Sequence, residues 1–98
     1  MKYRLSFLFL MLSLPFHSQT SEINISGRVT DVWDTAIPNV NVLLKGTERG
    51  TQTDESGWFS LRAQANEVLV FSSLGYGTYE RAVPETEEEL KIVLSPMV

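Results

Sequence analysis

The sequence predicts an all-β fold, a two-layer antiparallel β-sandwich of about seven strands. Three observations carry this prediction. Apolar and polar residues alternate with period two after Glu22, clusters of turn-forming residues recur about every ten residues, and helical periodicity is absent beyond residue 18. A single sheet cannot hide its own apolar face, so two sheets must pack against each other, about 10 Å apart.

The N-terminus has the features of a secretory signal peptide in their usual order. Basic residues stand before residue 5, an apolar run of ten residues covers 5–14, and a polar exit region follows Pro15. The run is too short to span a bilayer, which requires about 20 residues. The sequence therefore predicts a signal peptide at 1–18, with an approximate cleavage point, and one exported domain at 22–95 without a transmembrane segment.

Strand positions follow from the alternation of side chains. Ile23, Ile25 and Val29 alternate with polar residues, which is the pattern of a half-buried strand. The segment 68–73 is rich in β-branched and aromatic residues, which favour strands. We therefore expect strands at 23–30, 40–45, 51–53, 58–62, 68–73, 78–83 and 90–95. The expected core consists of their inward-facing apolar residues, namely Ile25, Val29, Val40, Val42, Leu44, Phe59, Leu61, Leu69, Phe71, Ile92 and Leu94.

The residue inventory excludes most chemistry from the expected domain. The chain has no cysteine, and its single histidine, His17, falls within the signal peptide. Disulfides, thiol catalysis, a lipid anchor on cysteine and a zinc site are therefore excluded. The acidic residues fall in turns and one loop rather than as a pair in a cleft. We expect no enzymatic activity, no cofactor and no metal, and a small exported domain without disulfides suits the bacterial periplasm.

The expected domain is acidic. Lys2 and Arg4 precede it, so six of the eight Lys and Arg residues remain, against all twelve Asp and Glu residues. This balance argues against binding to nucleic-acid phosphates. The glutamate-rich segment 85–89 is expected to be a solvated loop, with attraction of a basic partner or a cation as the alternative.

Two glycine-containing segments have some features of ligand-binding loops. Asp54 to Gly57 lacks the alternating ligands and the flanking helices of a calcium loop, so a hairpin turn capped by the Asp54 carboxylate is favoured. Gly46 to Thr51 lacks the Lys-Ser/Thr ending and the following helix of a phosphate loop. We expect both segments to be turns.

Several segments together resemble the carboxypeptidase-regulatory-like domain. The resemblance covers about residues 23–94, and its glycine and turn spacing is specific. It implies a transthyretin-like (prealbumin-like) seven-stranded sandwich, in agreement with the strand count. The matching segments are ISGRVTD at 25–31, IPNVNV at 37–42, KGT at 45–47, GT at 50–51, TD at 53–54, Gly57, FSL at 59–61 and LVFSSLGY at 69–76.

The first turn departs from the family pattern. The family usually has Gly, Pro and Gly where this chain has Asp34, Ala36 and Asn39. Asp and Asn tolerate the left-handed backbone conformation better than most residues do. We therefore expect the turn to be retained.

Exposed aromatic residues are the candidate binding site. We expect Trp33, Trp58 and Tyr79 to offer a surface to a protein partner or a glycan, because aromatic side chains supply large contact areas. Simple cover of a sheet edge is the alternative for Trp58. Tyr76 belongs to the Gly-Tyr signature of the family and is expected to pack structurally. The Asp-Thr-Ala sequence around Thr35 resembles an O-glycosylation acceptor of Bacteroidetes, which makes Thr35 a candidate modification site.

The resemblance also implies a context. Such domains follow the signal peptide of SusC/RagA-type TonB-dependent outer-membrane receptors of Bacteroidetes. They also occur alone, on other exported proteins, and on zinc carboxypeptidases, where they are not catalytic. We expect a non-catalytic envelope module that docks to a receptor or to an associated lipoprotein. We expect it in the periplasm, associated with the outer membrane. The alternatives are a stand-alone carbohydrate- or protein-binding sandwich and an accessory domain of a peptidase.

Overall fold

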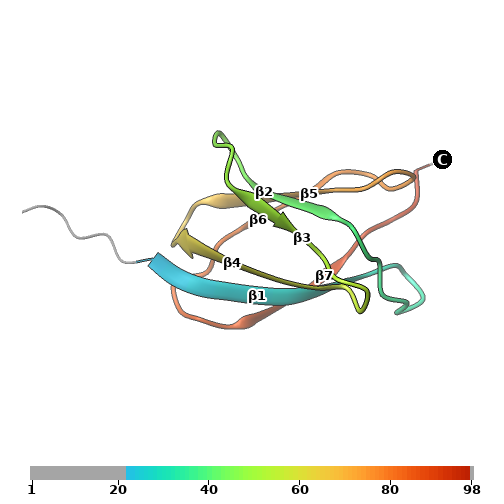
Figure 1. The fold of residues 1–98 in the computed structure, drawn as a ribbon, viewed down its shortest axis with the longest axis horizontal. Helices are drawn as coiled ribbons and strands as arrows, with labels where there is room; N and C mark the ends of the chain where they lie inside the picture. Colours follow the sequence, from blue (N-terminus) through green and yellow to red (C-terminus); the bar gives the residue numbers. More distant parts are fainter. Residues whose placement is uncertain (1–21, 98) are drawn as a thin grey trace, which may run out of the picture.

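The computed structural model describes residues 22–97 as two stacked β-sheets with the core between them (Figure 1). All seven expected strands form, each within two residues of its expected ends, which confirms the sandwich. The signal peptide predicted at 1–18 lies outside the described residues. The strands are β1 (Glu22–Thr30), β2 (Asn41–Leu44), β3 (Gly50–Gln52), β4 (Trp58–Gln64), β5 (Val68–Ser72), β6 (Tyr79–Ala82) and β7 (Glu89–Val93).

The strands are distributed over a three-stranded and a four-stranded sheet. Their orders are β4-β1-β7 and β3-β2-β5-β6. Neighbouring strands run antiparallel, with one departure from the expected pattern: β7 lies parallel to β1, from Ser26 opposite Glu89 to Thr30 opposite Val93. The chain crosses from β6 in one sheet to β7 in the other, so β7 enters its sheet from the same end as β1. Side-chain alternation gives the faces of a strand but not its neighbours, and this pairing was therefore not predictable from it.

The core fills the space between the two sheets. All the expected core residues are buried except Leu61, which packs against the core but is only partly buried. The rings of Phe59 on β4 and Phe71 on β5 meet edge to face, with their centroids 5.4 Å apart and their planes at 70°. This contact joins the two sheets. Four further apolar side chains are buried that the strand pattern did not assign to the core, namely Ile37, Ala63, Val83 and Leu90.

The connections follow the expected turn chemistry. Asp34 and Asn39 have φ values of 68° and 60°, which confirms that they adopt the left-handed conformation in place of the family's glycines. The Asp54 carboxylate accepts hydrogen bonds from the backbone N–H groups of Ser56 and Trp58, at 2.9 and 3.0 Å. The segment 54–57 is thus the predicted capped turn.

A buried hydroxyl fastens the first long loop to the end of β3. Thr53 is 3% exposed, and its Oγ1 donates to the carbonyl of Ile37 at 2.7 Å and accepts from the N–H of Val40 at 2.9 Å. Both backbone groups would otherwise be buried without a partner, which costs about 1–3 kcal/mol each. The side chain of Thr53 therefore fixes the path of the chain into β2.

Candidate interaction surfaces

The three predicted aromatic residues lie on different parts of the molecule. Trp33 is in the loop between β1 and β2 and is 75% exposed. Trp58 begins β4 opposite Arg28 of β1, on the outer face of the three-stranded sheet, and is 39% exposed. Tyr79 begins β6 and stands on the inner face of the other sheet, 38% exposed, with its ring centroid 6.2 Å from that of Phe71. Trp58 and Tyr79 therefore do not share one stacking surface.

Tyr76 and Thr35 have different environments. Tyr76 is partly buried and packs against the core, which confirms its structural role. Its backbone also bridges to Pro96, so the end of the described chain is held against the β5–β6 loop. Thr35 is exposed, and its N–H donates to the carboxylate of Asp31 at 2.9 Å. The Thr35 side chain is thus accessible, and its modification stays a prediction.

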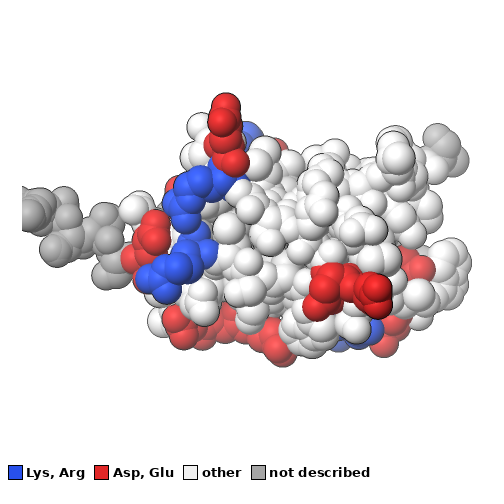
Figure 2. Space-filling model, viewed as in Figure 1, with Lys and Arg blue, Asp and Glu red and all other residues white. Residues whose placement is uncertain are grey.

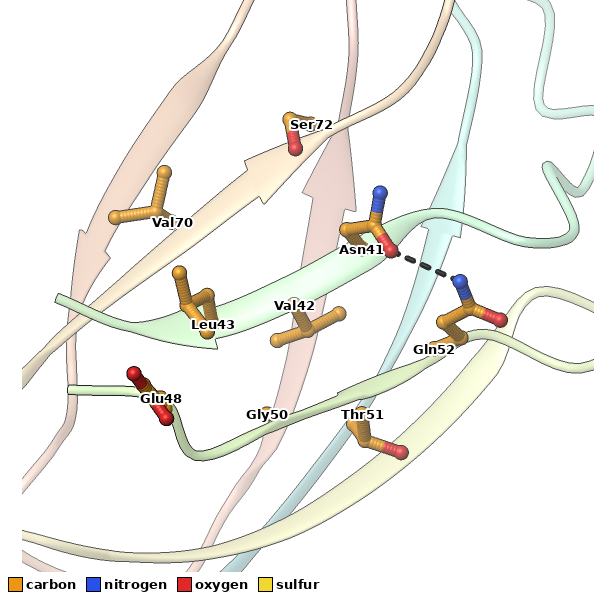
Figure 3. A pocket seen from close by; sticks show the side chains of 9 residues that line it. All are labelled: Asn41, Val42, Leu43, Glu48, Gly50, Thr51, Gln52, Val70 and Ser72. Atoms are coloured by element: carbon orange, nitrogen blue, oxygen red, sulfur yellow. Dashed lines mark hydrogen bonds between the residues drawn. The ribbon is translucent and has the colours of Figure 1, made fainter.

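An open hollow lies over the outer face of the four-stranded sheet (Figure 3). Its volume is about 710 Å³. Asn41 and Gln52 face each other across β2 and β3, and the Gln52 Nε2 donates to the Asn41 Oδ1 at 2.9 Å. The remaining lining comes from β2, β3, β5 and the turn before β3, namely Val42, Leu43, Glu48, Gly50, Thr51, Val70 and Ser72.

The chemistry of this hollow suits binding and not proton transfer. It offers amides, hydroxyls and the aliphatic side chains of Leu43 and Val70, with Glu48 as its one ionisable residue. General acid and base catalysis by carboxylates needs two of them. Sequence reasoning did not assign this surface, although Asn41 and Leu43 occupy the outward positions of β2 and were visible in its alternation.

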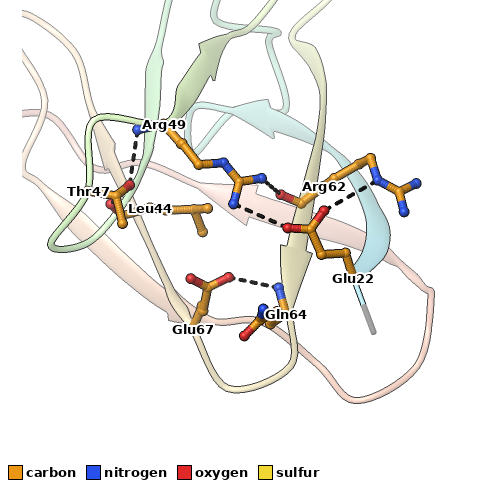
Figure 4. Close-up of polar contacts among 7 residues, drawn as sticks. All are labelled: Glu22, Leu44, Thr47, Arg49, Arg62, Gln64 and Glu67. Carbon is orange, nitrogen blue, oxygen red and sulfur yellow. Dashed lines mark hydrogen bonds and ion pairs between the residues drawn. The ribbon is translucent and has the colours of Figure 1, made fainter. Parts of the chain in front are cut away.

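The outer edge of β4 is closed by neighbouring residues at both of its ends and open at Ser60. In an antiparallel ladder every second residue directs its N–H and C=O away from the paired strand, and on β4 these residues include Trp58, Arg62 and Gln64. The Arg49 Nη2 donates to the carbonyl of Arg62 at 2.7 Å (Figure 4). The Glu67 Oε1 accepts from the N–H of Gln64 at 2.7 Å. Trp58 is bonded at both backbone groups to Asp54.

Charged residues support this closed edge. Glu22 pairs with Arg49 at 3.3 Å and with Arg62 at 3.6 Å, so one carboxylate holds two guanidinium groups (Figure 4). In Figure 2 most of the blue side chains gather at the left end beside red ones, and further red side chains lie along the lower edge and at the lower right. All three side chains are partly exposed, so these ion pairs orient the side chains and add little to the free energy of unfolding.

Two negative findings apply to residues 22–97. This part of the chain contains no group of three or more His, Cys, Asp or Glu residues placed to hold a metal ion. It also contains no helix that is long and apolar enough to cross a membrane.

Two solved structures share the fold at low sequence identity. A type II cohesin–X-dockerin complex from Acetivibrio cellulolyticus matches with a TM-score of 0.62 at 20% identity, over 74% of this chain and 57% of that chain. The 3-chlorocatechol 1,2-dioxygenase from Rhodococcus opacus 1CP matches with a TM-score of 0.61 at 13% identity, over 82% of this chain and 62% of that chain. Proteins of such different activity show that the sandwich by itself does not decide function.

Curated relatives with higher sequence identity are all TonB-dependent receptors. The chain is 37% identical over 76 residues to TonB-dependent receptor P3 of Formosa agariphila, which is 76% of this chain and 8% of the receptor. It is 37% identical over 62 residues to TonB-dependent receptor SusC of Bacteroides thetaiotaomicron, which is 63% of this chain and 6% of the receptor. The chain thus spans less than a tenth of the length of these relatives. The family model of the CarboxypepD_reg-like domain matches residues 25–97, and the chain belongs to that family.

Proposed function

We propose that this domain is a non-catalytic interaction module of the bacterial envelope that docks to a TonB-dependent receptor or to a lipoprotein associated with one. The observation that carries the proposal is the match to receptor-associated domains over nearly the whole described chain. The described residues add a rigid sandwich with exposed aromatic side chains and sheet edges. These are features that proteins use to bind one another.

A cross-linking experiment tests the docking role. The tagged protein is produced from the full 98-residue sequence in a Bacteroidetes host and cross-linked in intact cells. We expect an adduct with a TonB-dependent receptor or its lipoprotein, retained in the membrane fraction. A protein that stays monomeric and unattached in the periplasmic fraction under the same conditions, or one that turns over a substrate, contradicts the proposal.

The hollow over β2 and β3 favours a second candidate, binding of a carbohydrate. Paired amides beside aliphatic side chains can hydrogen-bond sugar hydroxyls and pack against a sugar ring. Titration with a panel of glycans, followed by amide NMR shifts, would locate binding at Asn41 and Gln52. Asn41→Ala should abolish those shifts, and Asn24→Ala, on the other sheet, should leave them intact. Silence across the panel removes this candidate.

The accessory domain of a peptidase is the remaining alternative. It predicts that the domain occurs in the same polypeptide as a peptidase, or binds one. Co-purification with a peptidase and not with a receptor would favour it over docking to a receptor.

A further inference from the structure

We propose that the partner is bound by strand addition at the free edge of β6, and that the added segment is basic at one end. This inference rests on the proposed docking function and names the edge and the chemistry of the partner. Each sheet has two edge strands, β3 and β6 in one and β4 and β7 in the other. An exposed edge presents unpaired N–H and C=O groups, which can pair with an incoming strand.

The edges of β3 and β4 are poorly suited to pairing with an incoming strand. The two strands lie side by side at the corner between the sheets, so each obstructs the other (Figure 1). Five outer backbone groups of β4, those of Trp58 and Gln64 and the carbonyl of Arg62, are in addition bonded to Asp54, Glu67 and Arg49. An incoming strand would have to break these bonds before it formed its own.

The edge of β6 is open. Val83 exchanges backbone hydrogen bonds with the β5 side of the ladder, through Glu67 and Asn66. By alternation, Glu80 and Ala82 direct their backbone groups away from β5. No residue between 22 and 97 caps these groups with a hydrogen bond. The Glu80 side chain instead pairs with Lys45 on the outer face, at 3.2 Å.

The edge of β7 offers less to a partner. The inward residues of β7, Leu90 and Ile92, are already buried, so an added strand would cover further apolar surface there only at Val93, which is 44% exposed on the outer face. The carbonyl of Ser95, just beyond β7, is taken by the N–H of Gly77 at 2.9 Å. Beside β6, by contrast, the ring of Tyr79 remains 38% exposed on the inner face. A strand added there would place an apolar side chain against this ring.

Charge identifies the incoming segment. Beyond β6 the chain continues into the exposed segment 85–89, which carries four glutamates. Of these, Glu87 accepts from the N–H of Asn24 on β1 at 3.2 Å, and Glu89 begins β7. The one basic residue of β6, Arg81, is half-buried on the inner face, opposite Leu69 of β5. A partner strand with lysine or arginine at the end beside 85–89 meets complementary charge, which steers association and fixes direction.

Two synthetic peptides test the inference with the protein produced from the full sequence. Both alternate threonine and valine, and one ends in lysines while the other ends in glutamates. We expect the lysine peptide to shift the amide NMR signals of residues 79–82 and to bind about tenfold more tightly than the glutamate peptide at low salt. Shifts at β4, at β7 or in the hollow, or equal binding of the two peptides, would overturn it.

Matched variants separate the edge from the fold. Ala82→Pro removes an outward N–H at the β6 edge, and Ser60→Pro removes one at the β4 edge, both at positions that a proline can occupy. Only Ala82→Pro should abolish binding. Because a proline can also unfold a short strand, Glu85→Gln with Glu88→Gln provides a second test: it should remove the preference for lysine and leave the spectrum of β6 intact. Persistence of the preference contradicts the inference.

Two outcomes distinguish this inference from the proposed function. If cross-linking to a receptor persists unchanged in Ala82→Pro, the proposed docking function is supported and strand addition at the β6 edge is wrong. If the protein self-associates through residues 79–82 without peptide, as measured by sedimentation and NMR, the occupant is a second copy of the chain and the basic partner is wrong.

Discussion

Along β4, both outward backbone groups of Trp58 and of Gln64 and the carbonyl of Arg62 are hydrogen-bonded to neighbouring residues. Along β6, those of Glu80 and Ala82 are bonded to no residue that the structure describes. The same contrast extends to the turns that lead into these strands. At one side of the sandwich the edge strand is hydrogen-bonded to neighbouring residues, and at the other its backbone groups remain free to pair. Capping of an edge strand is a recognised way to prevent unwanted strand pairing.

Two glycines with similar backbone angles sharpen the comparison most. Gly57 leads into β4 with φ +80°, and a Cβ there would lie 2.6 Å from the carbonyl oxygen of Val29 and 3.1 Å from the Cβ of Ala36. Gly75 leads toward β6 with φ +87°, and a Cβ there would meet nothing within 4 Å. We expect Gly57→Ala to lower the free energy of unfolding by about 3 kcal/mol and Gly75→Ala by about 1 kcal/mol. Equal losses in urea denaturation would mean that the two turns are equally tight.

Removal of the buried Thr53 hydroxyl should cause the next largest loss of stability. Thr53→Val keeps the shape of the side chain but leaves the N–H of Val40 and the carbonyl of Ile37 without their partner. We expect a loss of about 2 kcal/mol in the free energy of unfolding. Thr51→Val on β3 is the control and should change stability by less than about 0.5 kcal/mol. A neutral Thr53→Val would show that this hydroxyl does not fasten the loop.

Removal of the turn cap should cost less. Asp54→Ala deletes the carboxylate that accepts from Ser56 and Trp58, in an exposed turn where water can replace it. We expect a loss of about 1 kcal/mol and faster hydrogen exchange of the Trp58 amide. Glu55→Ala in the same turn should do neither. If exchange at Trp58 is unchanged, the β4 edge is protected by something other than Asp54.

The smallest effects compare two surface cations. Arg49→Met removes the donor to the Arg62 carbonyl and the pairing with Glu22, and should cost about 1 kcal/mol. Lys45→Met removes only the exposed pair with Glu80 and should cost less than about 0.5 kcal/mol. The measurement is thermal unfolding at low salt. A larger loss for Lys45→Met would mean that the β6 edge, too, is fastened by its side chains.

Local chemistry accounts for what was predicted correctly. The period-two pattern fixed which residues of β1, β2, β5 and β7 face inward, because side chains alternate strictly across a strand. Asp34 and Asn39 were correctly expected to take left-handed backbone angles, since short polar side chains tolerate them. The Asp54 turn followed from the same kind of argument.

The features that the sequence did not predict depend on contacts between segments that are distant along the chain. Leu61 follows the inward pattern of β4, yet it is only partly buried. Ile37 and Val83 lie outside regular strands and are buried because segments distant in sequence cover them. The hollow combines residues from β2, β3 and β5, and no single segment of the sequence reveals it.

The sequence by itself determined the class of fold, the positions of the strands, the conformations of the main turns and the lack of histidine and cysteine in residues 22–97. All of these depend on the identity and spacing of residues close together along the chain. The tertiary structure alone decided that β7 runs parallel to β1, that Trp58 and Tyr79 stand apart, and that most outward backbone groups of β4 are bonded while those of Glu80 and Ala82 on β6 are not. These features depend on contacts between residues far apart in sequence, and periodicity carries no information about which strand lies beside which.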